Sequence, residues 1–176
     1  MTDSIVVGEL RMERLLDAPM DRVWQFLVDP ALRATWLMGG PTDLRPGGHI
    51  GFTMLHDNLS DDPSVEVPER YRKNIGHSWS EEIVRVDPPR LLAFKWDGGK
   101  SGEVEFTLTS EGDRTRLVMH HTGIPTRDGT QNFGGGWYSH LATLERRIRG
   151  EPVPSFWALH AASEKIVTDA LASAEA

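Results

Sequence analysis

One stretch decides the fold that we expect for this chain: residues 134–150, which read GGGWYSHLATLERRIRG. Its apolar residues recur at spacings of four, three and four, which is the period of one stripe along an α-helix. They are Trp137, Leu141, Leu144 and Ile148. Because glycine is unfavourable inside a helix, the three glycines predict its start, and Gly150 followed by Pro152 predicts its end. The apolar stripe must be covered, so the helix is expected to lie across another layer.

Length and composition are those of one ordinary globular domain. The chain has 176 residues, of which 39% are hydrophobic and 26% are charged, and a chain of this size can bury a real core. We therefore expect a single domain over residues 1–176. Its core is expected to cover about residues 8–150, and residues 151–176 to form a C-terminal helical extension.

Charge and residue usage exclude several classes of protein. The formal net charge is −7 with scattered basic residues, which argues against a nucleic-acid partner. The chain has no Cys, so disulfides, thiolate nucleophiles and Cys-based zinc sites are excluded. No stretch approaches the roughly 20 apolar residues of a membrane helix, and no basic leader precedes an apolar run. The sequence thus predicts a cytoplasmic protein without a membrane partner.

Alternation of apolar and polar residues predicts most of the strands. The expected strands are residues 9–16, 49–54, 79–86, 91–96, 103–108 and 115–121. A helix is expected after Pro19 and a second short one around residues 32–36, between the first two strands. Because strands and helices are segregated along the chain, the expected class is α+β, with the long helix laid across an antiparallel sheet.

Two segments outside this pattern have predictions of their own. Residues 57–76 are polar, contain two prolines and show no regular period, so we expect a mobile loop near the mouth of any cavity. After Pro154, Ser155 is a plausible N-cap for a second helix. The apolar side of that helix is expected to contain Phe156, Leu159, Ile166 and Ala170. It would pack on the domain or across a dimer.

Several punctuating motifs, in order over about residues 9–150, resemble those of a known superfamily. They are Ala18-Pro19 with Val23-Trp24, Asp29-Pro30 with Trp36, Leu44-Arg45-Pro46-Gly47-Gly48, Asp87-Pro88-Pro89-Arg90-Leu91, and His121-Thr122-Gly123 with Gly136-Trp137 and Leu141. The chain resembles the START-like (SRPBCC) superfamily, in the branch named after activators of the heat-shock-protein-ninety ATPase. The resemblance implies a helix-grip fold, in which a curved antiparallel sheet wraps around a long C-terminal helix and encloses an interior cavity. That fold hosts lipid and hormone carriers, polyketide cyclases and chaperone-binding domains.

The residues that could support catalysis or metal binding do not form a set. His120 and His121 are adjacent, so on a strand they point to opposite faces and cannot chelate one metal. The carboxylates show no paired spacing for acid–base work, and the nucleophile, metalloprotease and phosphate-loop motifs are missing. The sequence therefore predicts no catalytic residues, no metal and no cofactor.

A helix-grip cavity would be lined by residues from the helix stripe and from the inward faces of the last strands. The residues that we expect there are Trp137, Leu141, Met119, His121 and Phe106. Apolar walls with a few polar groups are typical of small-molecule sites. We expect Trp137 to stack on a ligand and His121 to supply a polar contact.

Three functions remain open from the sequence. The leading one is binding or sensing of a small apolar or aromatic molecule without chemistry. The second is an enzyme of the cyclase or hydrolase kind, with His121 or an inward Arg14 as acid or base. The third is a protein-binding module, whose partner would be a chaperone or a second copy in a homodimer.

Overall fold

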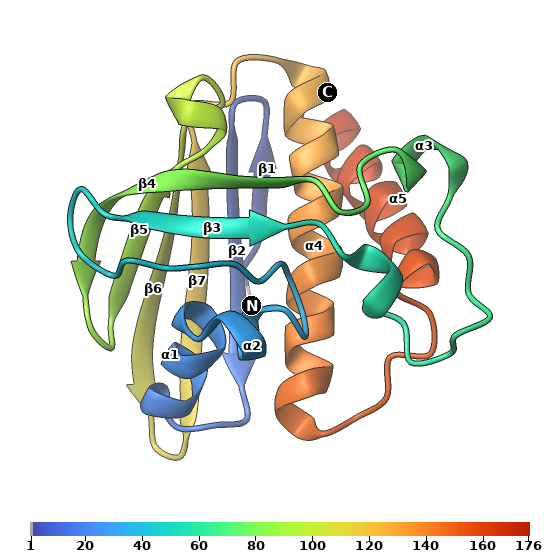
Figure 1. Ribbon diagram of the computed structural model, residues 1–176. Helices are drawn as coiled ribbons and strands as arrows, with labels where there is room; N and C mark the ends of the chain where they lie inside the picture. Colours follow the sequence, from blue (N-terminus) through green and yellow to red (C-terminus); the bar gives the residue numbers. More distant parts are fainter. Residues whose placement is uncertain (1) are drawn as a thin grey trace.

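The computed structural model describes residues 2–176 and shows a sheet covered by two helices (Figure 1). All neighbouring strands are antiparallel, and the seven-stranded sheet has the order β1-β2-β7-β6-β5-β4-β3. The strands are β1 (Ser4–Val6), β2 (Glu9–Leu16), β3 (His49–Thr53), β4 (Ser78–Asp87), β5 (Leu91–Lys95), β6 (Glu103–Glu111) and β7 (Arg114–Thr122). The helices are α1 (Met20–Val28), α2 (Pro30–Arg33), α3 (Glu69–Arg72), α4 (Arg127–Arg149) and α5 (Phe156–Ala174), with short 3-10 turns η1 (His56–Asn58) and η2 (Asp97–Gly99).

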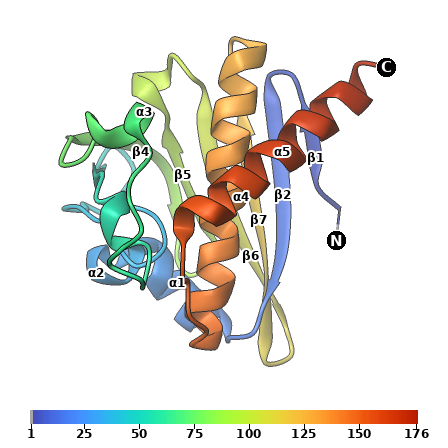
Figure 2. The same ribbon diagram turned by 90° about the vertical axis from the view of Figure 1, so that its right-hand side faces the viewer.

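The α+β helix-grip prediction is confirmed. Helix α4 lies against the sheet, and α5 crosses α4 obliquely on its other side and ends beside β1 (Figure 2). The alternation predicted for β7 also holds, since Leu117, Met119 and His121 are fully buried while His120 points outward to Glu9. The core therefore sits between one face of the sheet and α4.

The predicted start of the long helix is wrong. Helix α4 begins at Arg127, where the Thr126 hydroxyl accepts a hydrogen bond from the Gly129 amide, so the triple glycine lies inside the helix. The reason is the close approach of α5. A Cβ atom on Gly134 would lie 2.8 Å from Val167 Cγ1, and one on Gly135 would lie 3.0 Å from Glu164 Cγ. The predicted end is confirmed, because Gly150 caps the helix in the left-handed conformation.

Helix α5 begins after the N-cap Ser155, as expected, but most of its buried face differs from the prediction. Ile166 is 44% exposed, so its placement on the buried side is wrong. The buried residues are Phe156, His160, Ser163, Val167 and Leu171. Two of these are polar, which hid the stripe from a search based on apolar residues.

Residues 57–76 are partly regular and firmly attached, which the sequence did not indicate. Leu59 is fully buried in a small cluster with Val153 and Phe156. Arg147 of α4 pairs with Asp61 at 2.8 Å, and Arg70 pairs with Glu164 of α5 at 2.6 Å. The segment therefore forms a wall over the two helices; its mobility stays a prediction.

The buried cation Arg33 organises the chain between α1 and β3. Its guanidinium, on a side chain 1% exposed, donates hydrogen bonds to the carbonyls of Met38, Leu27 and Gly51 at 2.9–3.1 Å. Burial lowers the pKa of Arg33 to about 10, so it stays charged at neutral pH. Backbone dipoles compensate the charge, and the turn carrying Met38 is fixed as a result.

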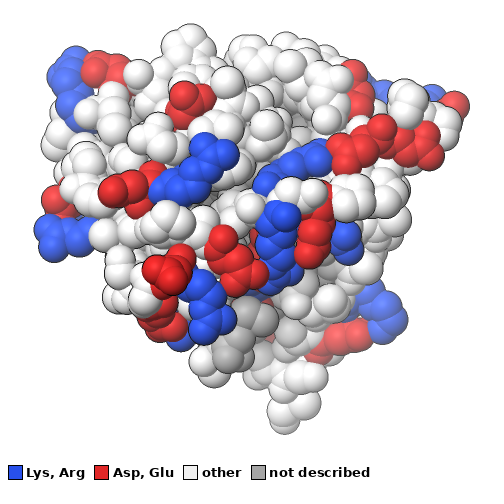
Figure 3. Space-filling model, turned by 90° about the horizontal axis from the view of Figure 1, so that it is seen from below, with Lys and Arg blue, Asp and Glu red and all other residues white. Residues whose placement is uncertain are grey.

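Two features of the structure concern the nucleic-acid and membrane partners that the sequence argues against: the distribution of surface charge and the character of the helices. On the face seen in Figure 3, cationic and anionic groups lie next to one another and form no patch of a single sign. Within residues 2–176, none of the helices combines the length and apolar character needed to cross a membrane.

The glycines of α4 give a test of the helix contact. We expect Gly136→Ala to raise the free energy of unfolding by about 0.5–1 kcal/mol, because alanine favours the helix and its Cβ meets nothing within 4 Å. Gly134→Ala should instead lower it by about 1 kcal/mol or more, because Val167 must move. Urea unfolding of both variants measures this. Equal stabilisation of the two would contradict the close contact of α4 with α5.

Candidate functional site

A cavity of about 190 Å³ opens between α4, the start of α5 and the segment that follows β3. Its walls are mainly aromatic and apolar, with a few polar side chains among them. The lining residues are Leu37, Met38, Met54, His56, Tyr71, Trp79, Trp96, Asn132, Phe133, Gly136, Trp137, His140, Phe156, Trp157 and His160.

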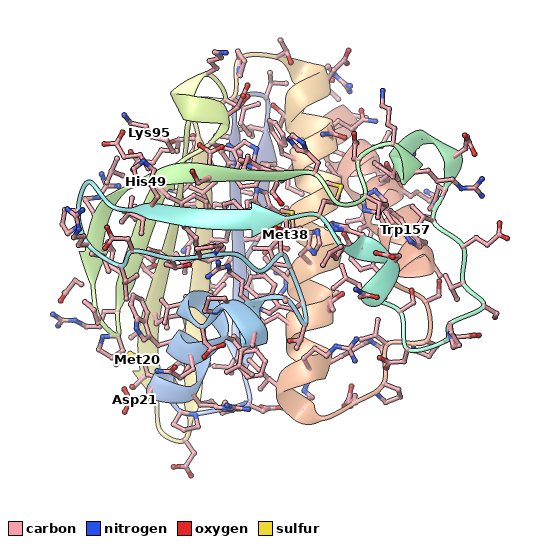
Figure 4. The ribbon with its side chains drawn as sticks, viewed as in Figure 1. Met20, Asp21, Met38, His49, Lys95 and Trp157 are labelled. Atoms are coloured by element: carbon pink, nitrogen blue, oxygen red, sulfur yellow. The ribbon has the colours of Figure 1, made fainter. Side chains whose placement is uncertain are left out.

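Each wall comes from a different part of the chain. Figure 4 labels Met38, from the turn that Arg33 holds, and Trp157, from the first turn of α5. The Tyr71 ring, from α3, stacks on Trp157 at 5.0 Å between ring centroids. In the middle of α4, Gly136 has no Cβ, which leaves room on the helix side. The cavity thus depends on the attachment of the 57–76 segment.

Of the five residues predicted to meet a ligand, only Trp137 lines this cavity. Met119, Leu141 and Phe106 are at most 2% exposed and lie in the core between α4 and the sheet. The Phe106 ring packs edge-on against Trp36 and Trp137, at 6.4 and 5.8 Å between centroids. These rings leave only about 10 Å³ of space beside Phe106. The larger volume therefore lies at the side of α4, and a binding role for the core residues stays a prediction.

His121 lies directly behind Trp137 and uses both ring nitrogens within the protein. Its Nε2 donates to the Ser101 carbonyl at 2.7 Å, and its Nδ1 accepts from Trp137 Nε1 at 3.0 Å. Burial lowers the pKa of His121, so the ring is neutral at neutral pH. In this arrangement His121 orients the Trp137 indole. Neither ring nitrogen of His121 is free for the polar contact to a ligand that we predicted.

Two other buried histidines, His56 and His140, form a hydrogen-bonded chain in the cavity wall. His140 Nδ1 lies 2.7 Å from the Trp36 carbonyl, and its Nε2 lies 3.1 Å from His56 Nε2. Burial lowers the pKa of His56 to about 4 and that of His140 well below its ordinary value. Both rings are therefore neutral at neutral pH.

A third histidine, His160, joins the wall segment to the helices. The Ser139 hydroxyl donates to the Gly135 or Gly136 carbonyl, each at 2.9 Å, so it accepts from His160 Nδ1 at 3.1 Å. His160 Nε2 in turn accepts from the Tyr71 hydroxyl at 2.8 Å. This chain fastens Tyr71 of α3 against both helices.

Ser139, His160 and Glu164 lie in sequence, with 3.1 Å from Ser139 Oγ to His160 Nδ1 and 3.4 Å from His160 Nε2 to Glu164 Oε1, and so resemble a hydrolytic triad. A serine nucleophile must give its proton to the histidine and must face the substrate. Ser139 instead gives its hydrogen to the helix backbone, and its side chain is fully buried. Within residues 2–176 there is also no cluster of three or more His, Asp or Glu side chains suited to a metal ion.

The sequence held a signal for these histidines that we did not use. His160 follows Phe156 by four positions and precedes Val167 by seven, which places it on the buried stripe of α5. His140 follows Gly136 and precedes Leu144, and so shares a face of α4 with them. A search based only on apolar residues left both histidines out of the expected stripes.

The curved antiparallel sheet packed on a long C-terminal helix is the fold of the START-like class of protein. The chain belongs to the family described as Activator of Hsp90 ATPase homolog 1-like protein, which matches residues 17–149, within the SRPBCC superfamily. A comparison with curated proteins gives no match.

Solved structures support this assignment. A protein from Bordetella parapertussis, solved by NMR, is 35% identical over 92% of this chain and 85% of its own, with a TM-score of 0.78. CalU16 from Micromonospora echinospora is 23% identical over 93% of this chain and 88% of its own, with a TM-score of 0.67. DynU16, from the dynemicin biosynthetic locus, is 22% identical over 85% of this chain and 50% of its own, with a TM-score of 0.62. The last two likenesses show the fold.

The buried neutral histidines should make the protein sensitive to acid. As pH falls below 6.5, His56 binds a proton in the unfolded chain but not in the folded one until pH reaches about 4. The stability present above pH 6.5 is lost across that window, by about 2 kcal/mol for His56 alone between about pH 7.5 and about pH 5. Chemical unfolding measures the free energy of unfolding at the two pH values. In His56→Gln, the decrease from about pH 7.5 to about pH 5 should be about 2 kcal/mol smaller than in the unmodified protein.

The matched control is His120→Gln, on the outer face of β7. This side chain is partly exposed and lies in no cavity wall. This substitution also removes the exposed contact with Glu9, so we expect its acid-induced loss of stability to be no smaller than that of the unmodified protein. An equal pH dependence in His56→Gln and the unmodified protein would show that His56 is not buried as a neutral ring.

Proposed function

We infer that this protein binds a small, mainly apolar or aromatic molecule in the cavity beside α4. The observation that carries the proposal is the 190 Å³ volume lined by Tyr, Trp and Phe side chains from five separate segments. A few polar groups in a mainly apolar concave wall are the usual composition of a small-molecule site. The Tyr71 and Trp157 rings, stacked at an interplanar angle of 20°, both belong to this wall.

Family and neighbours support a ligand-binding role. The family lies in a superfamily whose fold encloses a cavity, and DynU16 is described as coming from a biosynthetic locus. Binding without turnover is favoured over hydrolysis, because Ser139 is buried and keeps its hydrogen for the helix backbone. The family description also names an activator of a chaperone ATPase. A chaperone would need an exposed surface, whereas the features described above point inward.

Filling the cavity should abolish binding. We expect Gly136→Phe to weaken binding of 2-methoxynaphthalene, a small uncharged aromatic probe, by about tenfold or more, because the new ring extends from α4 into the cavity. The measurement is an NMR titration of backbone amides, with circular dichroism to show that the variant is folded.

The control places the same side chain outside. Ile166→Phe adds a ring to the exposed face of α5, where residue 166 is already 44% exposed, and should leave the affinity within about twofold. If a folded Gly136→Phe protein binds the probe as tightly as Ile166→Phe does, the ligand lies elsewhere and the proposed function is wrong. The same conclusion follows if the unmodified protein does not bind the probe at all.

A further inference from the structure

The hydrogen-bond chain in the cavity wall fixes which His56 nitrogen carries the proton. The Trp36 carbonyl can only accept, so His140 Nδ1 donates to it. Since the His140 ring is neutral, its Nε2 has no hydrogen and must accept from His56 Nε2. His56 is neutral as well, so its Nδ1 keeps a bare lone pair. That nitrogen is an obligatory hydrogen-bond acceptor.

This acceptor has no partner among the described residues. His56 is 6% exposed, and its ring lines the cavity. Its Nδ1 atom is buried and makes no hydrogen bond. Leaving a buried polar atom unpaired costs about 1–3 kcal/mol, so such an atom in a wall calls for a partner.

The same wall also contains a buried hydrogen-bond donor that has no partner among the described residues. Trp157 Nε1 can only donate, and it too is buried without a partner among residues 2–176. The two rings are neighbours, with centroids 6.0 Å apart and planes tilted by 33°. From this proximity of the rings we infer that one small polar group can reach both nitrogens at a hydrogen-bond distance of about 2.8–3.0 Å.

Building on the proposed function, we propose that the ligand carries a hydroxyl group, as in a phenol, which donates to His56 Nδ1 and accepts from Trp157 Nε1. The rest of the ligand lies against the aromatic wall. A hydroxyl is the smallest neutral group that does both.

Other polar groups suit the pair less well. An ether or ketone oxygen would satisfy Trp157 but would place lone pairs against the His56 acceptor. A carboxylate would do the same and would in addition bury a charge, which is costly without a countercharge. The nearby charged pair, Arg70 with Glu164, is already internally compensated. The polar end of the site therefore selects a neutral hydrogen-bond donor.

The test compares two probes of similar shape, 2-naphthol and 2-methoxynaphthalene. Both offer an oxygen to Trp157 Nε1, but only the naphthol offers a hydrogen to His56 Nδ1. We expect the unmodified protein to bind 2-naphthol about tenfold more tightly in competition titrations followed by NMR.

Two variants separate the two contacts. In His56→Phe, an aromatic ring is kept at the same place in the wall, while the Nδ1 acceptor and the Nε2 donor to His140 are both lost. The preference for naphthol over methoxynaphthalene should then fall to about twofold or less. In Trp157→Phe, both affinities should fall by a similar factor of about three to ten, with the preference retained. His120→Gln is the matched control and should change neither affinity.

The outcomes distinguish this inference from the proposed function. If both probes bind the unmodified protein equally, and Gly136→Phe blocks both, the cavity is a binding site but the hydroxyl anchor is wrong. If neither probe binds, both proposals fail. Long-range ¹⁵N–¹H NMR of the histidine rings in the unmodified protein adds a test that needs no variant. His56 should show the Nε2–H tautomer, with an Nδ1 shift that moves on adding 2-naphthol; the Nδ1–H tautomer would overturn the inference.

Discussion

The close contact between α4 and α5 is the constraint on which the rest of the site depends. Gly134 and Gly135 let the second helix approach until Val167 and Glu164 lie against the backbone of the first. From that position the start of α5 supplies one wall of the cavity, and Glu164 and His160 hold the α3 segment in place. Wider spacing of the helices would remove both the wall and its attachment.

Much of the fold was predictable because its signals are local. The alternation in β7 placed His121 inside and His120 outside, and Gly150 marked the end of α4, as the structure shows. The start of α4 was mispredicted because a glycine is unfavourable in an isolated helix but is required where another helix touches it. That requirement comes from residues 30 positions away, and no local pattern contains it.

The site was harder to predict than the fold. Trp137 lines the cavity and was predicted to face the interior from its place on an apolar stripe, whereas His56 stands at the edge of a polar segment and gave no periodic signal. Its burial arises from contacts with His140 and Phe156, both far along the chain. We also expected the volume under α4, but Trp36 and Phe106 fill that space. The interior volume that stays open depends on how the large side chains of different elements pack together. The sequence of a single helix or strand does not contain this information.

The bonds that hold the wall over the cavity also set how a ligand would enter. Arg70 with Glu164 and Arg147 with Asp61 are surface pairs, each worth at most about 1 kcal/mol and weakened by salt. The sheet and α4 are held by a continuous apolar core. Residues 57–76 are also held by the buried Leu59 and by the Tyr71 hydrogen bond to His160, so we expect their local opening to cost more than the two ion pairs but less than unfolding of the core. Ligand exchange would follow the rate of this local opening, so it would speed up with ionic strength while the melting temperature of the core stayed nearly constant.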